Sequence, residues 1–225
     1  MRNDGVSMSG LTLYTYFRSS AAYRVRITLN LKQLEYESAF IHLMKDGGQQ
    51  RSEEYQHINP QMLIPSLKLE TDDVLHQSLA IIEYLDETYP QAPLLPGNAL
   101  QRAHIRAFAL SICCDIHPLN NLRVLGYLRD ALTISENQRT TWYQHWITQG
   151  FTALEKKLQR IPRNGPFCFG RTPTLADICL IPQVYNAIRF ECDLNPYPLI
   201  QDINHHCLTL DAFKHAAPEM QADNE

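Results

Sequence analysis

The sequence predicts an α/β domain followed by an all-α domain. Three observations lead to this fold class: a strand–helix–strand pattern at the start, a hairpin and helix after it, and helical periodicity without a convincing strand in the second half. The 225 residues are 44% hydrophobic and 20% charged, which is an ordinary globular composition. The chain can therefore bury a core in one large domain or two small ones.

Residues 11–43 contain the strand–helix–strand pattern. In residues 11–16 (LTLYTY), β-branched and aromatic side chains alternate, which is typical of a strand. From residue 21 the apolar side chains form two stripes on nearly opposite sides of a helix, so we expect a helix that is covered on two sides. Residues 36–43 (YESAFIHL) resemble a second strand, and the spacing implies a parallel pair with a right-handed crossover.

The next segments predict a hairpin and a helix. Residues 66–70 alternate with period two, and a turn leads from them into residues 74–76, so these segments form an antiparallel hairpin. Ser78 is a candidate N-cap of the helix that follows. The densest cluster of proline and glycine comes after this helix and marks a domain boundary. We expect one domain at residues 10–90 and another at residues 97–218.

The second domain is predicted to be entirely helical. Thr174 and Asp177 resemble a capping box at the start of a helix that Pro182 is expected to kink. Apolar residues recur at helical spacing in three further segments. These segments are residues 99–116, 142–160 and 199–213.

Charge, hydropathy and cysteine spacing exclude several classes of protein. Lys and Arg number 20 against 24 Asp and Glu, and no block of like charge occurs, which disfavours nucleic-acid binding. We find neither a signal peptide nor an apolar stretch long enough to cross a membrane, so we expect a cytoplasmic protein without a membrane partner. None of the six cysteines forms a CxxC pair, and we interpret them as reduced thiols.

Two clusters are not expected to be sites. Residues 205–207 (His-His-Cys) point about 100° apart along a helix and cannot converge on one ion, so no metal is expected. The cysteines at 113 and 114 fail the same test. Trp142 and Trp146, one helical turn apart, indicate packing rather than a cofactor platform.

Three local features of the first domain carry chemistry. Ser19 and Ser20 lie at a strand-to-helix turn, where hydroxyls cap a helix and its positive end can stabilise a bound thiolate. Ile64 precedes a proline at the start of a strand, and a cis bond there would leave its backbone groups to pair with an extended peptide. Gln77 and Ser78 open a helix whose N-terminus can hold a carboxylate.

Seven segments are similar in sequence to one protein family. They are YFRSSAAYRVR (16–26), KDGGQQ (45–50), NPQMLIPSL (59–67), HQSLAIIEYLDE (76–87), IHPLNNLRVL (116–125), TLADICLIPQVYNA (174–187) and RFECDLNPYP (189–198). Together with the order of the elements, they resemble the zeta class of glutathione transferases over about residues 11–218. The resemblance implies a thioredoxin-like domain joined to an all-α domain, glutathione as cofactor and a homodimer. It also implies maleylacetoacetate isomerase activity, which belongs to tyrosine and phenylalanine catabolism.

The resemblance implies a set of residues that contact glutathione. Two departures from the family pattern bear on it. Ala21 stands where the zeta motif has cysteine, so no cysteine nucleophile acts at that turn. His117 stands where some members have glutamine, and either side chain can donate to a carboxylate. The implied contacts, matched motif by motif, are Ser19, Ser20, Gln50, Ile64, Gln77, Ser78, His117 and Asn121.

The implied reaction needs a nucleophile and cations. The glutathione thiolate adds to the cis double bond of a conjugated diketo dicarboxylate, the bond rotates, and elimination returns glutathione with the trans isomer. Ser19 and the helix N-terminus would lower the pKa of the thiol, and a cation would hold a substrate carboxylate. Arg189 is the best candidate for this cation by resemblance, ahead of Arg18, Arg24 and Arg26.

Other functions stay open at this level. Maleylpyruvate isomerisation differs only in the length of the substrate. A non-catalytic binding module would agree with Ala21 but not with the retained Ser19, Ser78 and Arg189. Conjugation or dehalogenation of small α-halo acids is a third possibility that the same site could host.

Overall fold

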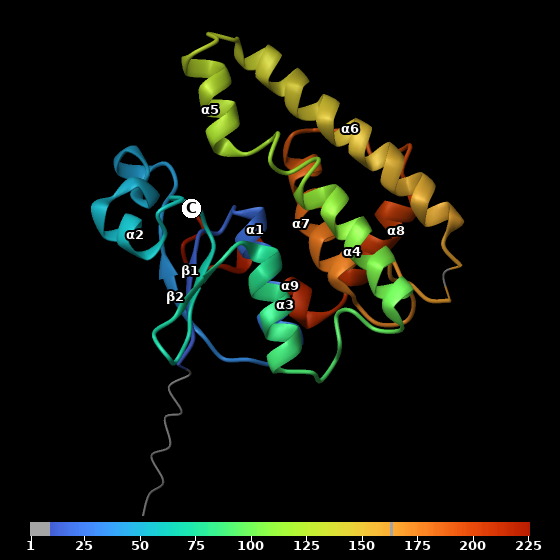
Figure 1. Ribbon diagram of the computed structural model, residues 1–225. Coiled ribbons are helices and arrows are strands. Elements are labelled where there is room, and N and C mark those ends of the chain that lie inside the picture. Colours follow the sequence, from blue (N-terminus) through green and yellow to red (C-terminus); the bar gives the residue numbers. More distant parts are fainter. Residues whose placement is uncertain (1–9, 163) are drawn as a thin grey trace, which may run out of the picture. The chain divides into compact units, whose positions relative to one another are not determined.

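The computed structural model describes residues 10–162 and 164–225 of the chain (Figure 1). The described residues form two compact units. One contains the chain up to Ala92 together with Asp211–Glu225, and the other contains Pro93–Leu210. The C-terminal segment therefore packs with the beginning of the chain, which no sequence pattern indicates.

A four-stranded sheet forms the centre of the first unit. Its strands are β1 (Thr12–Thr15), β2 (Glu37–Phe40), β3 (Ser66–Lys68) and β4 (Val74–His76). They lie in the order β2-β1-β3-β4, with β1 parallel to β2 and β3 antiparallel to both its neighbours. Both the parallel pair and the hairpin are as predicted. The Ile64-Pro65 peptide bond, immediately before β3, is cis, which is also as predicted.

Helices cover the sheet of the first unit. They are α1 (Ser20–Leu31), α2 (Glu53–Ile58), α3 (Ser78–Thr88) and α9 (Asp211–Lys214), with short 3-10 turns at Lys45–Gly47, Gln49–Arg51 and Pro218–Met220. Helix α1 packs against both α3 and α9, while α2 lies on the other side of the strands (Figure 1). Val25 from one apolar stripe of α1 and Ile27 from the other are both fully buried, so α1 is covered on two sides as predicted.

The described residues of the second unit form helices and no named strand. The helices are α4 (Ala99–Cys113), α5 (Leu122–Asp130), α6 (Glu136–Arg160), α7 (Leu175–Arg189) and α8 (Pro198–Cys207). Helices α4 and α7 run side by side (Figure 1). The predicted capping box of Thr174 and Asp177 is present at the start of α7. The first unit is thioredoxin-like and the second is all-α, which confirms the predicted fold class.

The main differences from the sequence expectations are at three element boundaries. The helix expected over residues 142–160 begins earlier, because Ser135 and Gln138 form a capping box ahead of Glu136. The stripe expected over residues 199–213 is divided, since α8 ends at Cys207 and α9 belongs to the first unit. Ser78 is the first residue of α3 rather than its N-cap.

Several features concern the described residues as a whole. None of their helices is both long and apolar enough to span a bilayer. All six cysteines fall within the described residues and are thiols rather than disulfides. No group of three or more His, Cys, Asp and Glu side chains among the described residues is arranged to hold a metal ion.

Candidate active site

The ends of the four strands meet at one edge of the sheet. Thr15 of β1 pairs with Phe40 of β2. Ser66 of β3 pairs with Tyr14 on one side and with His76 on the other. Strands β1, β2 and β4 therefore end, and β3 begins, at this common edge. The segments attached there contain the glutathione contacts predicted for the first unit, which are Ser19, Ser20, Gln50, Ile64, Gln77 and Ser78.

Ser19 is the N-cap of α1. Its backbone is extended, and its Oγ accepts a hydrogen bond from the Ala22 amide at 3.2 Å. Because the hydroxyl accepts from the helix, its hydrogen is left to donate to a group beyond the helix end. The first turn of α1 reads Ser-Ala-Ala-Tyr and carries no negative charge, so the positive end of the helix is not neutralised locally. The arrangement suits a bound anion such as a thiolate.

The side chains of Arg26 and Asp223 fix the loop between β1 and Ser19. The fully buried guanidinium of Arg26 donates to Thr15 Oγ1 at 3.0 Å, and to the carbonyls of Tyr16 at 3.3 Å and Phe17 at 3.0 Å. The Phe17 amide donates to Asp223 Oδ2 at 2.9 Å. Arg26 is thus occupied by the loop, which removes it as a candidate for the substrate carboxylate. Its structural role is to hold the turn that presents Ser19.

Gln50 lies in the loop that leaves β2. Its side chain is buried, and Nε2 donates to the Leu43 carbonyl at 3.5 Å. Its Oε1 is buried and has no hydrogen-bond partner among the described residues. His42 fixes the same loop, because its Nδ1 accepts from the amides of Met44 at 3.1 Å and Lys45 at 2.8 Å. The loop therefore holds an unused acceptor, Gln50 Oε1, that a ligand can satisfy.

Gln77 and Ser78 lie where β4 gives way to α3. Gln77 is the N-cap with a left-handed backbone (φ 68°), and its Nε2 donates to Gln61 Oε1 at 2.9 Å. Ser78 is buried, and its Oγ accepts from Arg24 Nη1 at 3.3 Å. The left-handed turn at Gln77 places Ser78 inside the helix, which explains why Ser78 is not the cap. The N-terminus of α3 therefore lies at Gln77 and Ser78, and we call this place the Ser78 corner.

The second unit carries the remaining predicted residues. Asn121 is the N-cap of α5, and its Oδ1 accepts from the Arg123 amide at 3.0 Å. His117 precedes it in the loop after α4 and is partly buried. Arg189 is the last residue of α7, where its exposed guanidinium lies 5.0 Å from the ring centre of Phe190. Its exposure leaves the guanidinium accessible to an anion.

Helix α6 connects the loop at residues 117–121 with the end of α7. Trp142 Nε1 donates to the carbonyl of Leu119 at 2.9 Å, and Asn120 Nδ2 donates to the carbonyl of Tyr143 at 3.2 Å. The Tyr143 ring in turn stacks on Phe190 with centroids 3.5 Å apart. Burial raises the pKa of Tyr143, and the charge of the neighbouring Arg189 opposes this rise. The 117–121 loop and Arg189 are therefore held near the same stretch of α6.

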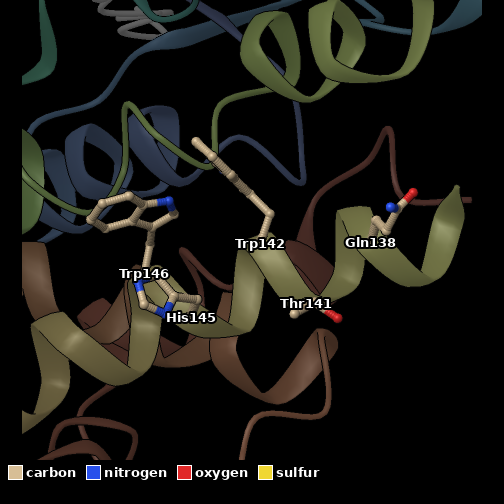
Figure 2. A pocket seen from close by; sticks show the side chains of 5 residues that line it. All are labelled: Gln138, Thr141, Trp142, His145 and Trp146. Atoms are coloured by element: carbon tan, nitrogen blue, oxygen red, sulfur yellow. The ribbon is translucent and has the colours of Figure 1, made fainter. Parts of the chain in front are cut away.

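An open pocket of about 410 Å³ lies along the same helix (Figure 2). Its two indole rings meet edge to face, with centroids 5.6 Å apart, so Trp142 and Trp146 pack against each other. The pocket adjoins the 117–121 loop through the Trp142–Leu119 hydrogen bond. Its lining consists of Gln138, Thr141, Trp142, His145 and Trp146.

Some site residues escape sequence reasoning. Asp223, near the C-terminus, accepts a hydrogen bond from the loop before Ser19, and no local sequence pattern predicts this contact. Arg24 and Arg26 leave a detectable signal, because both fall within a helix that the apolar stripes predict to be covered on two sides. Charged residues in such a helix must be buried, and buried charges need partners.

A thioredoxin-like unit with a serine-capped first helix, followed in the chain by a helical unit, defines a glutathione transferase. A family model described as the N-terminal domain of glutathione S-transferase matches residues 13–93. The chain is 50% identical over 216 residues to a probable maleylacetoacetate isomerase of Vibrio cholerae, covering 96% of this chain and 99% of the relative.

Two solved structures are similar over nearly the whole chain. The holo structure of a maleylpyruvate isomerase, described as a bacterial zeta-class enzyme, has a TM-score of 0.92 and 45% identity, and the match covers 95% of this chain and 100% of the other. A maleylacetoacetate isomerase from Methylobacterium extorquens, with bound malonate and glutathione, has a TM-score of 0.91 and 36% identity, with coverage of 95% and 99%. The chain belongs to the zeta class of glutathione transferases, the family of the maleylacetoacetate isomerases.

Proposed function

We propose that this chain catalyses the glutathione-dependent cis–trans isomerisation of maleylacetoacetate to fumarylacetoacetate. One observation carries the proposal: the hydroxyl of Ser19, with its hydrogen unused by the helix, lies at the positive end of α1 on the edge where the strand ends meet. Bound glutathione supplies a thiolate nucleophile, which adds to the cis double bond and later leaves from it. The Vibrio cholerae relative, named a probable maleylacetoacetate isomerase, supports this choice of substrate.

The sheet edge fits a tripeptide that carries two carboxylates and an ammonium group. Gln50 Oε1, buried without a partner among the described residues, suits a donor on the ligand. Ser78 at the N-terminus of α3 suits a carboxylate. Backbone groups of Ile64, just before β3, would pair with the extended peptide as an added strand does. Gln77 would contact the same γ-glutamyl end.

Ser19 would act on the sulfur of the tripeptide. A donor hydroxyl and an uncompensated helix N-terminus both favour a thiolate over a thiol. They would therefore lower the pKa of the glutathione thiol. Ser20 is adjacent and buried, and provides a second hydroxyl at the turn. Ala21 offers no thiol, so nucleophilic attack falls to the tripeptide alone.

Residues of the second unit are also proposed to bind ligands. Arg189 would bind a carboxylate of the substrate, because a guanidinium matches a carboxylate with two parallel hydrogen bonds. His117 and Asn121 would contact glutathione, as family resemblance implies. The stacked pair of Tyr143 and Phe190 would hold the end of α7 in place beneath Arg189.

Maleylpyruvate isomerisation is the second candidate. The similar structure of a maleylpyruvate isomerase, at 45% identity over 95% of this chain, favours it. Both substrates carry a cis double bond conjugated to a carbonyl, and they differ in length. The relative kcat/KM of the purified protein on the two substrates, measured with and without glutathione, separates the candidates. Glutathione binding without turnover of either substrate would instead identify a non-catalytic module.

The role of Ser19 is tested by substitution. Ser19→Ala is expected to lower turnover about ten- to a thousandfold, because it removes a donor to the developing charge. Ser19→Thr keeps both the hydroxyl and the cap and should retain most activity. Ser135→Ala removes a comparable helix cap at the start of α6 and serves as the control for cap loss alone. Full activity in Ser19→Ala would refute the assignment.

We further propose that the enzyme is a cytoplasmic homodimer. Both statements rest on its membership of the family. Size-exclusion chromatography with light scattering, performed on the purified chain, should give the mass of two chains. The mass of a single chain at micromolar concentration would exclude a stable homodimer.

A further inference from the structure

Arg24 is a buried cation that has no counter-ion among the described residues. Its side chain, in the middle of α1, is only 2% exposed. Its Nη1 donates to Ser78 Oγ at 3.3 Å, whereas its Nε and Nη2 have no hydrogen-bond partner among the described residues. Arg26, two residues further along the helix, is equally buried but donates to several oxygens. The two arginines therefore differ: one is satisfied by the fold, and the other is not.

An unsatisfied buried guanidinium is costly for a folded protein. Five N–H groups and a full charge are removed from water, and a single long hydrogen bond to a neutral hydroxyl does not replace that solvation. No carboxylate of the described residues hydrogen-bonds to Arg24. Such a group is expected where an anionic ligand completes the electrostatics of a site.

The contact with Arg24 also fixes the direction of the Ser78 hydroxyl. A guanidinium can only donate, so Ser78 Oγ must be the acceptor in this hydrogen bond. The hydrogen of Ser78 is then available to an acceptor on a ligand. Ser78 begins an eleven-residue helix whose first turn reads Ser-Leu-Ala-Ile, without negative charge. Its hydroxyl, the helix end and the buried cation all favour a negatively charged acceptor.

We propose that Arg24 is a positioning residue that makes the Ser78 corner selective for the α-carboxylate at the γ-glutamyl end of glutathione. It orients the Ser78 hydroxyl as a donor, and its buried positive charge acts on this carboxylate through that hydroxyl. The inference rests on the proposed function, because it takes glutathione as the ligand of the sheet edge. It adds a residue that makes no direct contact with the ligand but sets the charge preference of the subsite.

The test compares two ligands on the purified full-length protein. One is glutathione, and the other is 4-aminobutyryl-cysteinyl-glycine, which is glutathione without the α-carboxylate in question. Calorimetry gives the dissociation constants of both ligands for the unmodified protein and for Arg24→Met, which preserves much of the buried volume. Arg24→Met is expected to raise the dissociation constant of glutathione about ten- to a hundredfold, and to change that of the analogue about twofold or less. The preference for glutathione should therefore largely disappear.

Kinetics and a conservative variant exclude a merely structural role. In Arg24→Met the KM for glutathione should rise, while kcat at saturating glutathione stays within about twofold, since the interaction is equal in the ground and transition states. Arg24→Lys keeps the charge without the planar fork and should recover part of the ligand preference. If Arg24→Met does not fold, the Lys variant and Ser78→Ala are measured with the same two ligands, and each should show a reduced preference.

Failure of this inference differs from failure of the proposed function. If Arg24→Met weakens the binding of both ligands equally, or leaves the binding of both unchanged, the proposed role of Arg24 is wrong. A lack of preference for glutathione over the analogue in the unmodified protein would overturn it as well. The proposed function fails separately, if the unmodified protein does not bind glutathione or binds it without turning over either diketo acid.

Discussion

Arg189 is the residue on which recognition of the substrate is proposed to depend. We expect Arg189→Ala to raise the KM for the diketo acid or to lower kcat by about tenfold or more, because a carboxylate in a partly dry site loses its cation. Glutathione binding should stay near normal, since the contacts proposed for the tripeptide lie mainly on the first unit. Arg189→Lys should recover part of the activity. Steady-state kinetics and calorimetry measure the two effects.

Arg160 offers a matched control for this substitution. It is an exposed arginine at the last residue of α6, just as Arg189 is at the last residue of α7. Arg160→Ala should leave both the turnover of the diketo acid and the binding of glutathione unchanged. Equal loss of substrate turnover and glutathione binding in Arg189→Ala would indicate a structural arginine, and no loss in either would direct attention to Arg18.

His42 makes the loop that carries Gln50 sensitive to acid. Its Nδ1 accepts two backbone hydrogen bonds and so cannot carry a proton without breaking them. Partial burial, and then the charges of Lys45 and Arg18, hold the pKa of His42 below 6.5. Between the folded pKa and 6.5 the unfolded chain binds more protons, so stability rises with pH and is lost as pH falls through that window.

We therefore expect His42→Asn to reduce the pH dependence of stability. The Asn oxygen can accept from the loop but does not titrate, so the fall in the free energy of unfolding between about pH 7 and about pH 5 should be smaller than in the unmodified protein. Urea unfolding at a series of pH values measures this difference. His104→Asn removes an exposed histidine of α4 and is the control. An identical pH dependence for His42→Asn and the unmodified protein would exclude this role.

At the scale of elements, the capping box of α7 should contribute strongly to the second unit. Asp177 is fully buried and accepts from the Cys168 amide, the Thr174 amide and Thr174 Oγ1, each at 2.8 Å. Burial raises the pKa of Asp177, and these hydrogen bonds oppose the rise. Asp177→Asn turns an amide group toward one of the donors, and we expect the free energy of unfolding to fall by about 1–3 kcal/mol.

The exposed capping box of α6 provides the comparison. Gln138→Ala removes the side-chain oxygen that accepts from the exposed Ser135 amide. We expect the free energy of unfolding to fall by about 1 kcal/mol or less. Denaturant unfolding measures both variants under the same conditions. A smaller loss in Asp177→Asn than in Gln138→Ala would contradict the importance of the buried box.

Elements with strong local signals were predictable from the sequence. The two apolar stripes of α1 correctly indicated a helix covered on both sides, and alternation correctly indicated the hairpin of β3 and β4. The N-cap expected at Ser78 is wrong, because Gln77, with a left-handed backbone, takes that position. The division between α8 and α9 was missed because apolar spacing continues across the break, although α9 packs with the first unit.

At the scale of the whole molecule, local patterns predict positions better than they predict distant contacts. Residue types at strand and helix ends make Ser19, Gln77 and Ser78 candidates, and the register of the sheet brings the segments that carry them to one end of the sheet. The support of Asp223 for the turn before Ser19 spans nearly the whole chain, so no local pattern could reveal it. The partnership of Arg24 with Ser78 depends likewise on how α1 and α3 pack.

The most direct measurement is a pH titration of glutathione bound to the protein, followed by the ultraviolet absorbance of the thiolate. If the Ser19 hydroxyl and the N-terminus of α1 stabilise the thiolate, the apparent pKa of the bound thiol should lie below the ordinary thiol value of about 8.5. In Ser19→Ala it should move back toward that value, and in Ser19→Thr it should stay low. A bound thiol that titrates like free glutathione in the unmodified protein, or a low pKa that persists in Ser19→Ala, would contradict the central role of Ser19.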